Sequence, residues 1–268
     1  GHLLFALFWL FRQKIQALLS LAVLVASGPS ISGLYGFTSP RLPINKGLKI
    51  VSQNVRRLES YPDHNQTVTP AAFQQHLQNL QADVLCLQEF IATPAKRQPY
   101  LEALHAVGLK HIIHDPERSS LLIAARFPLQ SIKNHYYENL VNGYQIAELE
   151  LGNRTINLIN VHLRTNQITN LTNHIAEEGS LKKKETWRDI GKALAKYKNA
   201  TITRTQQAQN LTRSLASFQD PSIICGDFND TSQSYPYQLL KGQRKDAFLQ
   251  KGHAWGSTYA GKIPGLRI

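Results

Sequence analysis

Four apolar stretches of the sequence each end in polar residues that can take part in chemistry. The stretches are Leu48–Asn54, Asp83–Glu89, Ile156–His162 and Ser222–Asp230. Short runs rich in Val, Ile and Leu predict strands of an α+β fold. Because one edge of a sheet can gather the ends of several strands, we expect these ends to share one pocket. The polar residues that they would bring there are Asn54, Glu89, His162, Asp227 and Asn229.

The last stretch, Ser222-Ile-Ile-Cys-Gly-Asp-Phe-Asn-Asp230, is the most informative. It carries Asp227 and Asn229 two residues apart, and on an extended backbone both side chains can point into one pocket. There a carboxylate can hold a metal ion or a water, while a carboxamide binds a phosphate oxygen. Taken alone, Gly-Asp-Phe-Asn is equally typical of a turn. The three upstream strand ends favour the site, because Asn, Glu, His and Asp suit a hard cation and a phosphate.

With these strings in view, the chain resembles the endonuclease/exonuclease/phosphatase superfamily from about Leu48 to Ile268. A further string, Ser120–Pro128, is similar to the family's strand and Ser-Arg-x-Pro turn, with Ala125 where Ser is usual. The string Thr205–Asn210 is similar to its Arg-x-x-Gln-Ala helix, with Thr205 at the Arg position. The resemblance implies a four-layer α/β/β/α sandwich of the DNase I-like type, with two mixed sheets face to face and helices outside.

The resemblance also implies a role for each site residue. Glu89, with Asn54 close by, would hold Mg²⁺, with Mn²⁺ as a second possibility. Asp227, Asn229 and His162 would be catalytic, and a metal-activated water would attack phosphorus. Each residue has a structural alternative: Asn54 as a turn former, Glu89 as a helix-dipole partner, and His162 as a hydrogen-bonded core histidine.

The implied function is a Mg²⁺-dependent hydrolase of phosphate esters, of the phosphodiesterase or nuclease type. Its substrate would be nucleic acid, a phospholipid head group or a small phosphoester, and the sequence indicates no obligate protein partner. The alternative is a catalytically inactive, membrane-tethered module that binds anionic lipid or nucleic acid. The net charge of +12 agrees with either function.

The end of the sequence bears on this choice. Pro264-Gly-Leu-Arg-Ile268 is similar to the lead-in to the family's Arg-Ile-Asp strand, and the sequence stops one residue before that Asp. The family's later Ser-Asp-His string would follow. The chain contains no Met and opens at Gly1 within an apolar run. We therefore expect it to be a fragment of a longer open reading frame.

The N-terminal residues predict a membrane anchor. Residues 15–40 contain no charged side chain, and about 20 apolar residues suffice for a spanning helix. We expect residues 1–40 to hold the end of one span, a short basic hairpin at Arg12 and Lys14, and a second span. A linker (41–47) and a catalytic domain (48–268) that is incomplete at its C-terminus would follow. Charge asymmetry then predicts the bacterial inner membrane, with the catalytic domain in the periplasm.

The alternative for this N-terminal segment is a signal peptide. Arg12 and Lys14 would form its basic start, and Ala26-Ser-Gly28 its small residues. The apolar Leu3–Phe11 stretch ahead of the charges favours the anchor, because a signal peptide has no such stretch.

The other patterns give local predictions. The basic run from Ser180 to Lys198 is expected to be a solvated helical face, with a surface for an anionic partner as the alternative. Cys86 and Cys225 are expected to be small buried side chains rather than a disulfide or a metal pair. The remaining alternation predicts strands at 48–53, 84–88, 109–114, 120–125, 130–137, 144–151, 154–161 and 222–225. It predicts helices at 70–80, at 98–107 and within 181–218.

Overall fold

The computed structural model describes residues 2–10, 14–38, 47–59, 67–90, 93–117, 120–138, 141–166, 184–259 and 267–268. The chain divides into two compact units. The larger is Pro43–Asn229, and the smaller joins Gly1–Leu42 to Asp230–Ile268. The domain boundaries expected from the sequence stay a prediction.

Two four-stranded sheets form the centre of the larger unit, with strand orders β2-β3-β5-β4 and β6-β7-β8-β9. The first sheet contains β2 (Ile50–Asn54), β3 (Val84–Gln88), β5 (Leu121–Ala125) and β4 (His111–His114). The second contains β6 (Leu129–Tyr136), β7 (Gly143–Leu151), β8 (Arg154–His162) and β9 (Ser222–Asp227). Only β2 with β3 and β8 with β9 pair in parallel among these strands, so each sheet is mixed.

The two sheets pack face to face because their strands carry apolar side chains on the inner face. Val84 and Cys86 of β3 belong to one buried cluster with Ala147, Leu149 and Leu158 of the second sheet. The intervening residues of β3 point the other way, since successive side chains of a strand alternate between faces. Every residue of β3 is therefore buried, as expected for a strand covered on both sides.

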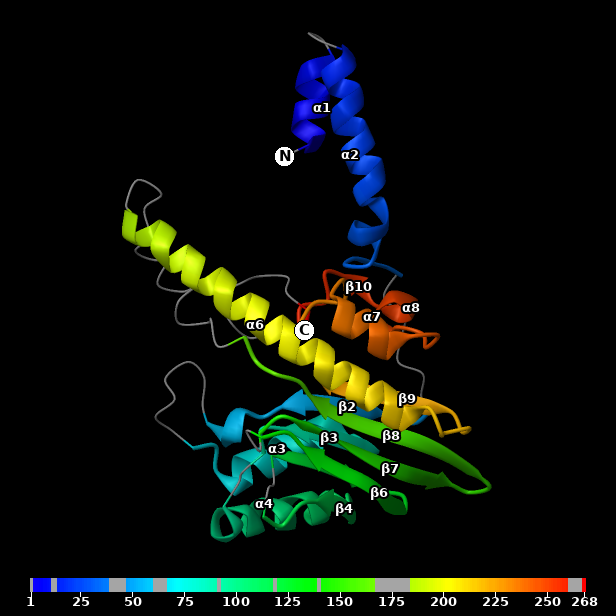
Figure 1. Cartoon of the computed structure of the whole chain (residues 1–268). Helices are drawn as coiled ribbons and strands as arrows, with labels where there is room; N and C mark the ends of the chain where they lie inside the picture. Colours follow the sequence, from blue (N-terminus) through cyan, green and yellow to red (C-terminus); the bar gives the residue numbers. More distant parts are fainter. Residues whose placement is uncertain are drawn as a thin grey trace. The chain divides into compact units, whose positions relative to one another are not determined.

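Helices cover both outer faces. On the first sheet, α3 (Pro70–Leu80) and α4 (Pro94–Ala106) contribute Phe73 and Tyr100 to a cluster with Leu85 and Leu87 of β3. On the second sheet, α6 (Lys184–Leu215) accepts a hydrogen bond from the Tyr137 hydroxyl at the Gln207 carbonyl oxygen, 3.0 Å away. Figure 1 shows α4 and α6 on opposite sides of the stacked sheets. The predicted α/β/β/α layering is confirmed.

Helix α3 has the predicted bounds. The Thr69 hydroxyl accepts a hydrogen bond from the Ala72 backbone N–H, and Pro70 follows as the first helical residue. Helix α4 starts at Pro94 rather than at the predicted residue 98, because Pro94 also suits a first helical position and Pro99 is accommodated inside the helix. The long basic region forms α6 from residue 184, and residues 180–183 lie outside the described residues.

The smaller unit contains α1 (His2–Leu10), α2 (Lys14–Ser32), α7 (Tyr235–Lys241), α8 (Ala247–Lys251) and the paired strands β1 (Gly36–Phe37) and β10 (His253–Ala254). Within the part of the chain that the structure describes, no helix is both long and apolar enough to cross a membrane. The predicted transmembrane segments are therefore not supported. Helix α2 has 19 residues, and Gln16, Ser20 and Ser27 dilute its apolar content. The periplasmic location stays a prediction.

Candidate active site

The strand ends singled out in the sequence meet at one edge of the two sheets. Asn54 is the last residue of β2, and Glu89 directly follows β3. His162 and Asp227 are the last residues of β8 and β9, and they are paired in the parallel ladder. Side-chain contacts join the two sheets here, so the predicted residues from four strands lie together within the larger unit.

Asn54 connects the two carboxylates. Its Nδ2 donates to Glu89 Oε1 and to Asp227 Oδ2, at 3.0 Å in each case. Its Oδ1 accepts a hydrogen bond from the Arg56 backbone N–H at 2.9 Å. The opposite amide orientation would turn the oxygen toward two carboxylates and the NH₂ group toward a backbone donor, so chemistry selects this one. Asn54 thus holds the carboxylates of the two sheets together, and its predicted role as a metal ligand stays a prediction.

Glu89 has a backbone conformation that a side chain other than glycine seldom adopts. Its φ is +51°, in the left-handed region. Two backbone bonds hold it there: the Glu89 carbonyl accepts from Arg57 N–H at 2.6 Å, and Phe90 N–H donates to the Ser120 carbonyl at 3.1 Å. Such a conformation costs about 1–3 kcal/mol and persists where neighbouring structure enforces it, often at functional sites. The kink directs the Glu89 carboxylate toward Asn54 and His162.

His162 is almost completely buried, with its side chain 1% exposed. Its Nδ1 lies 3.2 Å from the carbonyl oxygen of Val141, which can only accept, so Nδ1 carries the proton of this contact. Its Nε2 lies 3.6 Å from Glu89 Oε1 and has no hydrogen-bond partner among the described residues. A buried polar atom without a partner is uncommon. His162 therefore presents one uncommitted nitrogen beside the carboxylates.

The Gly-Asp-Phe-Asn string forms a tight turn and also supplies the site. The Asn229 backbone N–H donates to Asp227 Oδ1 at 2.8 Å, with Asn229 at a φ of +52°. Gly226 has a φ of +144°, and a Cβ there would lie 1.9 Å from the Val161 carbonyl oxygen. Only glycine fits this approach. The two alternatives for the string, a turn and a site, are thus both realised.

A buried polar layer that the sequence analysis missed lies beneath the site. Gln88 and Asn160 are 1% and 0% exposed. Gln88 Nε2 donates to Asn160 Oδ1 at 2.7 Å, and Asn160 Nδ2 donates to the carbonyl oxygens of Leu87 and Leu122 at 2.9 and 3.1 Å. A signal was available, because Asn160 stands two residues before His162 and so shares its strand face.

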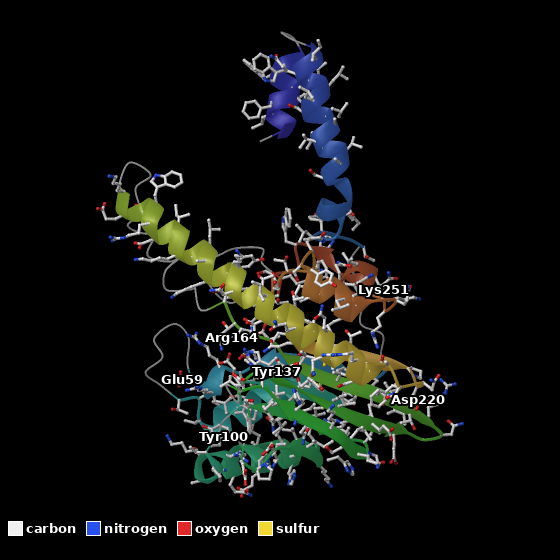
Figure 2. All side chains as sticks on the ribbon, viewed as in Figure 1. Glu59, Tyr100, Tyr137, Arg164, Asp220 and Lys251 are labelled. Atoms are coloured by element: carbon white, nitrogen blue, oxygen red, sulfur yellow. The ribbon has the colours of Figure 1, made fainter. Side chains whose placement is uncertain are left out.

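One alignment within the resemblance is wrong by a residue. Thr205 was expected at the Arg position of the family's Arg-x-x-Gln-Ala helix. In α6 the buried residues are Arg204, Gln207 and Ala208, which match that pattern directly, and Thr205 is only partly buried. Residues three apart share a helix face, so Arg204 and Gln207 face the larger unit together. Figure 2 labels Arg164, whose backbone N–H donates to Gln207 Oε1 at 2.9 Å.

The donor set was examined for a metal ion. Among the residues that the structure describes, no three or more His, Cys, Asp and Glu side chains are gathered to enclose one. Mg²⁺, however, is usually held by one or two carboxylates and completes its shell with waters and substrate oxygens. Glu89 and Asp227 converge on the Asn54 amide, and the Glu89 side chain is 28% exposed. These oxygen donors fit a Mg²⁺ site of that open kind.

The chain belongs to the Endonuclease/Exonuclease/phosphatase family, whose profile matches residues 51–268. Members of this family are generally hydrolases of phosphate esters and typically use divalent metal ions. The resemblance inferred from the strand ends is confirmed.

Solved structures of similar fold include D. rerio TDP2 humanized by 14 mutations, at 17% identity over 73% of this chain and 67% of that chain, with a TM-score of 0.48. A β-hairpin deletion mutant of Staphylococcus aureus beta toxin gives 15% identity, 75% and 74% coverage and a TM-score of 0.49. Sphingomyelinase C from Streptomyces griseocarneus gives 14%, 75%, 70% and 0.46. No curated protein sequence matches the chain.

Proposed function

We propose that this chain is the catalytic part of a Mg²⁺-dependent hydrolase of phosphate esters. One observation carries the proposal. Carboxylates from two different sheets, Glu89 and Asp227, lie 3.0 Å from the same Asn54 nitrogen, beside the buried His162 whose Nε2 has no partner among the described residues. A purely structural arrangement would leave neither the strained Glu89 backbone nor a buried histidine nitrogen without a partner.

The metal contribution follows from the donor atoms. Glu89, with Asn54 close by, would hold Mg²⁺ or Mn²⁺, and the ion would neutralise charge on the scissile phosphate. Asn54 keeps the Glu89 carboxylate in place by donating to it at 3.0 Å.

The remaining residues would act on water and on the phosphate. Asp227 would orient the attacking water and take up its proton. Asn229 donates one amide hydrogen to the Leu163 carbonyl at 3.0 Å, which leaves its other hydrogen and its oxygen for a phosphate oxygen and the nucleophile. His162 would donate a proton from Nε2 to the leaving group or to a non-bridging oxygen.

The substrate is an anion, and the net charge of +12 favours its approach. Nucleic acid, a phospholipid head group and a small phosphoester all satisfy this condition. The alternative, a module that binds such an anion without chemistry, predicts binding without turnover.

The test uses the full-length protein with Mg²⁺ and a panel of DNA, RNA, sphingomyelin, inositol phosphates and bis(p-nitrophenyl) phosphate. We expect hydrolysis of at least one substrate, loss of activity with EDTA and a fall of about 10²–10⁴-fold in Asp227→Asn. Asp220→Asn is the matched control, because Asp220 is exposed and precedes the same strand. Binding without turnover would refute the proposal, and so would turnover that survives in Asp227→Asn.

A further inference from the structure

Two buried residues of α6 grip the segment that follows β8. Gln207 Oε1 accepts from the Arg164 backbone N–H at 2.9 Å. Arg204 Nη1 donates to the Arg164 carbonyl oxygen at 3.0 Å and to Asn166 Oδ1 at 2.7 Å. Arg204 and Gln207 are 0% and 4% exposed. The helix therefore fixes the backbone of Arg164 on both its donor and its acceptor side.

The same segment is bonded to the turn that carries the site. Asn166 Nδ2 donates to the Asn229 carbonyl oxygen at 3.2 Å, and Asn229 Nδ2 donates to the Leu163 carbonyl oxygen at 3.0 Å. Leu163 N–H in turn donates to the Asp227 carbonyl oxygen at 3.0 Å. A continuous series of hydrogen bonds thus runs from Arg204 through Asn166 to Asn229 and Asp227.

The geometry requires an arginine at the start of this series. The second terminal nitrogen of Arg204, Nη2, donates to Thr201 Oγ1 at 2.9 Å, and its Cζ lies 5.6 Å from the centroid of the Tyr197 ring. A planar guanidinium serves these directions at once, whereas a lysine ammonium is a single point. Asn229 also needs support, because its φ of +52° is a costly conformation outside glycine.

We propose that Arg204 is a positioning residue, which holds Asn229 and Asp227 in their reactive orientation through the side chain of Asn166. Arg204 touches neither carboxylate of the site, so its effect passes through the bonded backbone. The inference rests on the proposed phosphoester hydrolase activity, because it concerns the orientation of the same site.

The main test compares Arg204→Met with Arg213→Met in the full-length protein. Arg213 lies on the same helix but is exposed, so it controls for the loss of one charge and for the change of residue type. A displacement of about 1 Å at a site can cost about 100-fold in rate. We expect kcat to fall roughly 10- to 100-fold in Arg204→Met with KM changed less than about threefold. Arg213→Met should match wild type, and Arg204→Lys should recover only part of the loss.

A double-mutant cycle identifies the route. Asn166→Ala should lower kcat as Arg204→Met does, and the double variant should be little worse than either single variant, because both break one series of bonds. Additive losses would refute the role of Asn166. A fall in melting temperature with unchanged kcat in the folded enzyme would show that Arg204 is only structural.

Hydrogen exchange at residues 226–229 gives a readout that does not depend on activity. We expect exchange there to be about tenfold faster in Arg204→Met, at a temperature where the protein stays folded, and unchanged in Arg213→Met. Should wild type hydrolyse no substrate, the proposed function fails, and this measurement still decides whether Arg204 orders the turn. Equal exchange in both variants would overturn the inference.

Discussion

The side chains of Gln88 and Asn160 come from different sheets and are hydrogen-bonded to each other at 2.7 Å, one layer beneath the candidate active site. Asn160 also donates to two carbonyl oxygens of the first sheet, at Leu87 and Leu122. One amide of the second sheet thus satisfies both edges of β3 and β5 at the point where the strands end. The distance between the sheets, and with it the separation of Glu89 from His162 and Asp227, is fixed by this buried layer.

Replacing Asn160 with leucine should therefore be costly. The change keeps the volume but leaves two carbonyl oxygens and the Gln88 amide without a partner, and we expect the free energy of unfolding to fall by about 2–4 kcal/mol. Asn157→Leu is the matched control, because Asn157 is buried on the same strand and its amide makes no hydrogen bond among the described residues. That variant should be near neutral or stabilising. Urea unfolding measures both, and equal losses would contradict the assigned role of Asn160.

The sequence predicted the strands and the gathering of their ends because both depend on local patterns. Apolar runs define buried strands, and the last polar residue of each run marks the edge at which a parallel pair can place it. Asn54, Glu89, His162 and Asp227 were found in this way. The strand predicted to end at residue 161 extends to His162, and the one predicted to end at 225 extends to Asp227. These two residues are held in the ladder rather than in a loop.

The contacts between distant segments were not predictable from one sequence. Nothing near Glu89 indicates its left-handed backbone, because the bonds that enforce it come from Arg57 and Ser120. The shift of one residue at Thr205 has a similar cause: both Thr205 and Arg204 fit a helix, and only the tertiary contact of Arg204 with Asn166 distinguishes them.

The stability of the protein should depend on pH through His114. Burial lowers the pKa of His114 below its ordinary value of 6.5, and the nearby Arg97 adds to this, while contacts with Asp115 oppose it. The unfolded chain then binds more protons than the folded chain just below pH 6.5, so stability falls as pH drops from about 7.5 through 6.5, until the folded pKa is passed. His114→Gln keeps an acceptor for Arg97 and should flatten part of this decline in thermal melts. His105→Gln, at an exposed position, should leave the slope unchanged, and an unaltered slope in His114→Gln would contradict the prediction.

Gly226→Ala should damage both stability and the site. A Cβ there would meet the Val161 backbone at 1.9 Å, and backbone atoms of a paired strand cannot move aside. We expect a loss above about 2 kcal/mol in the free energy of unfolding, because strain and overpacking add. Gly152→Ala is the control, since Gly152 also has a positive φ, +66°, but nothing lies within 4 Å of its Cβ position. That change should cost only about 1 kcal/mol. Denaturant unfolding would reject the steric argument if the two losses were equal.

His162→Ala should lower turnover most for substrates with poor leaving groups. A buried nitrogen that donates a proton matters more as the leaving oxygen becomes more basic. A series of aryl phosphate diesters with graded leaving-group pKa should give a steeper dependence of rate on leaving group in the variant than in wild type. His105→Ala, at an exposed position on α4, should keep the wild-type slope. Equal slopes in wild type and His162→Ala would remove the proton-donor role.

The roles of Glu89 and Asp227 should separate in a metal titration of the full-length enzyme. Glu89→Gln keeps the size of the side chain but removes the charge that a hard cation needs, so higher Mg²⁺ or Mn²⁺ should restore part of its activity. Asp227→Asn should lose turnover with little change in KM, and extra metal should not help, because a carboxylate that orients water acts in the transition state. Glu150→Gln, exposed near the far end of β7, controls for the loss of one charge. If neither variant responded to metal and both lost the same activity, the division of roles would be wrong, and unchanged activity in either would exclude that residue from the site.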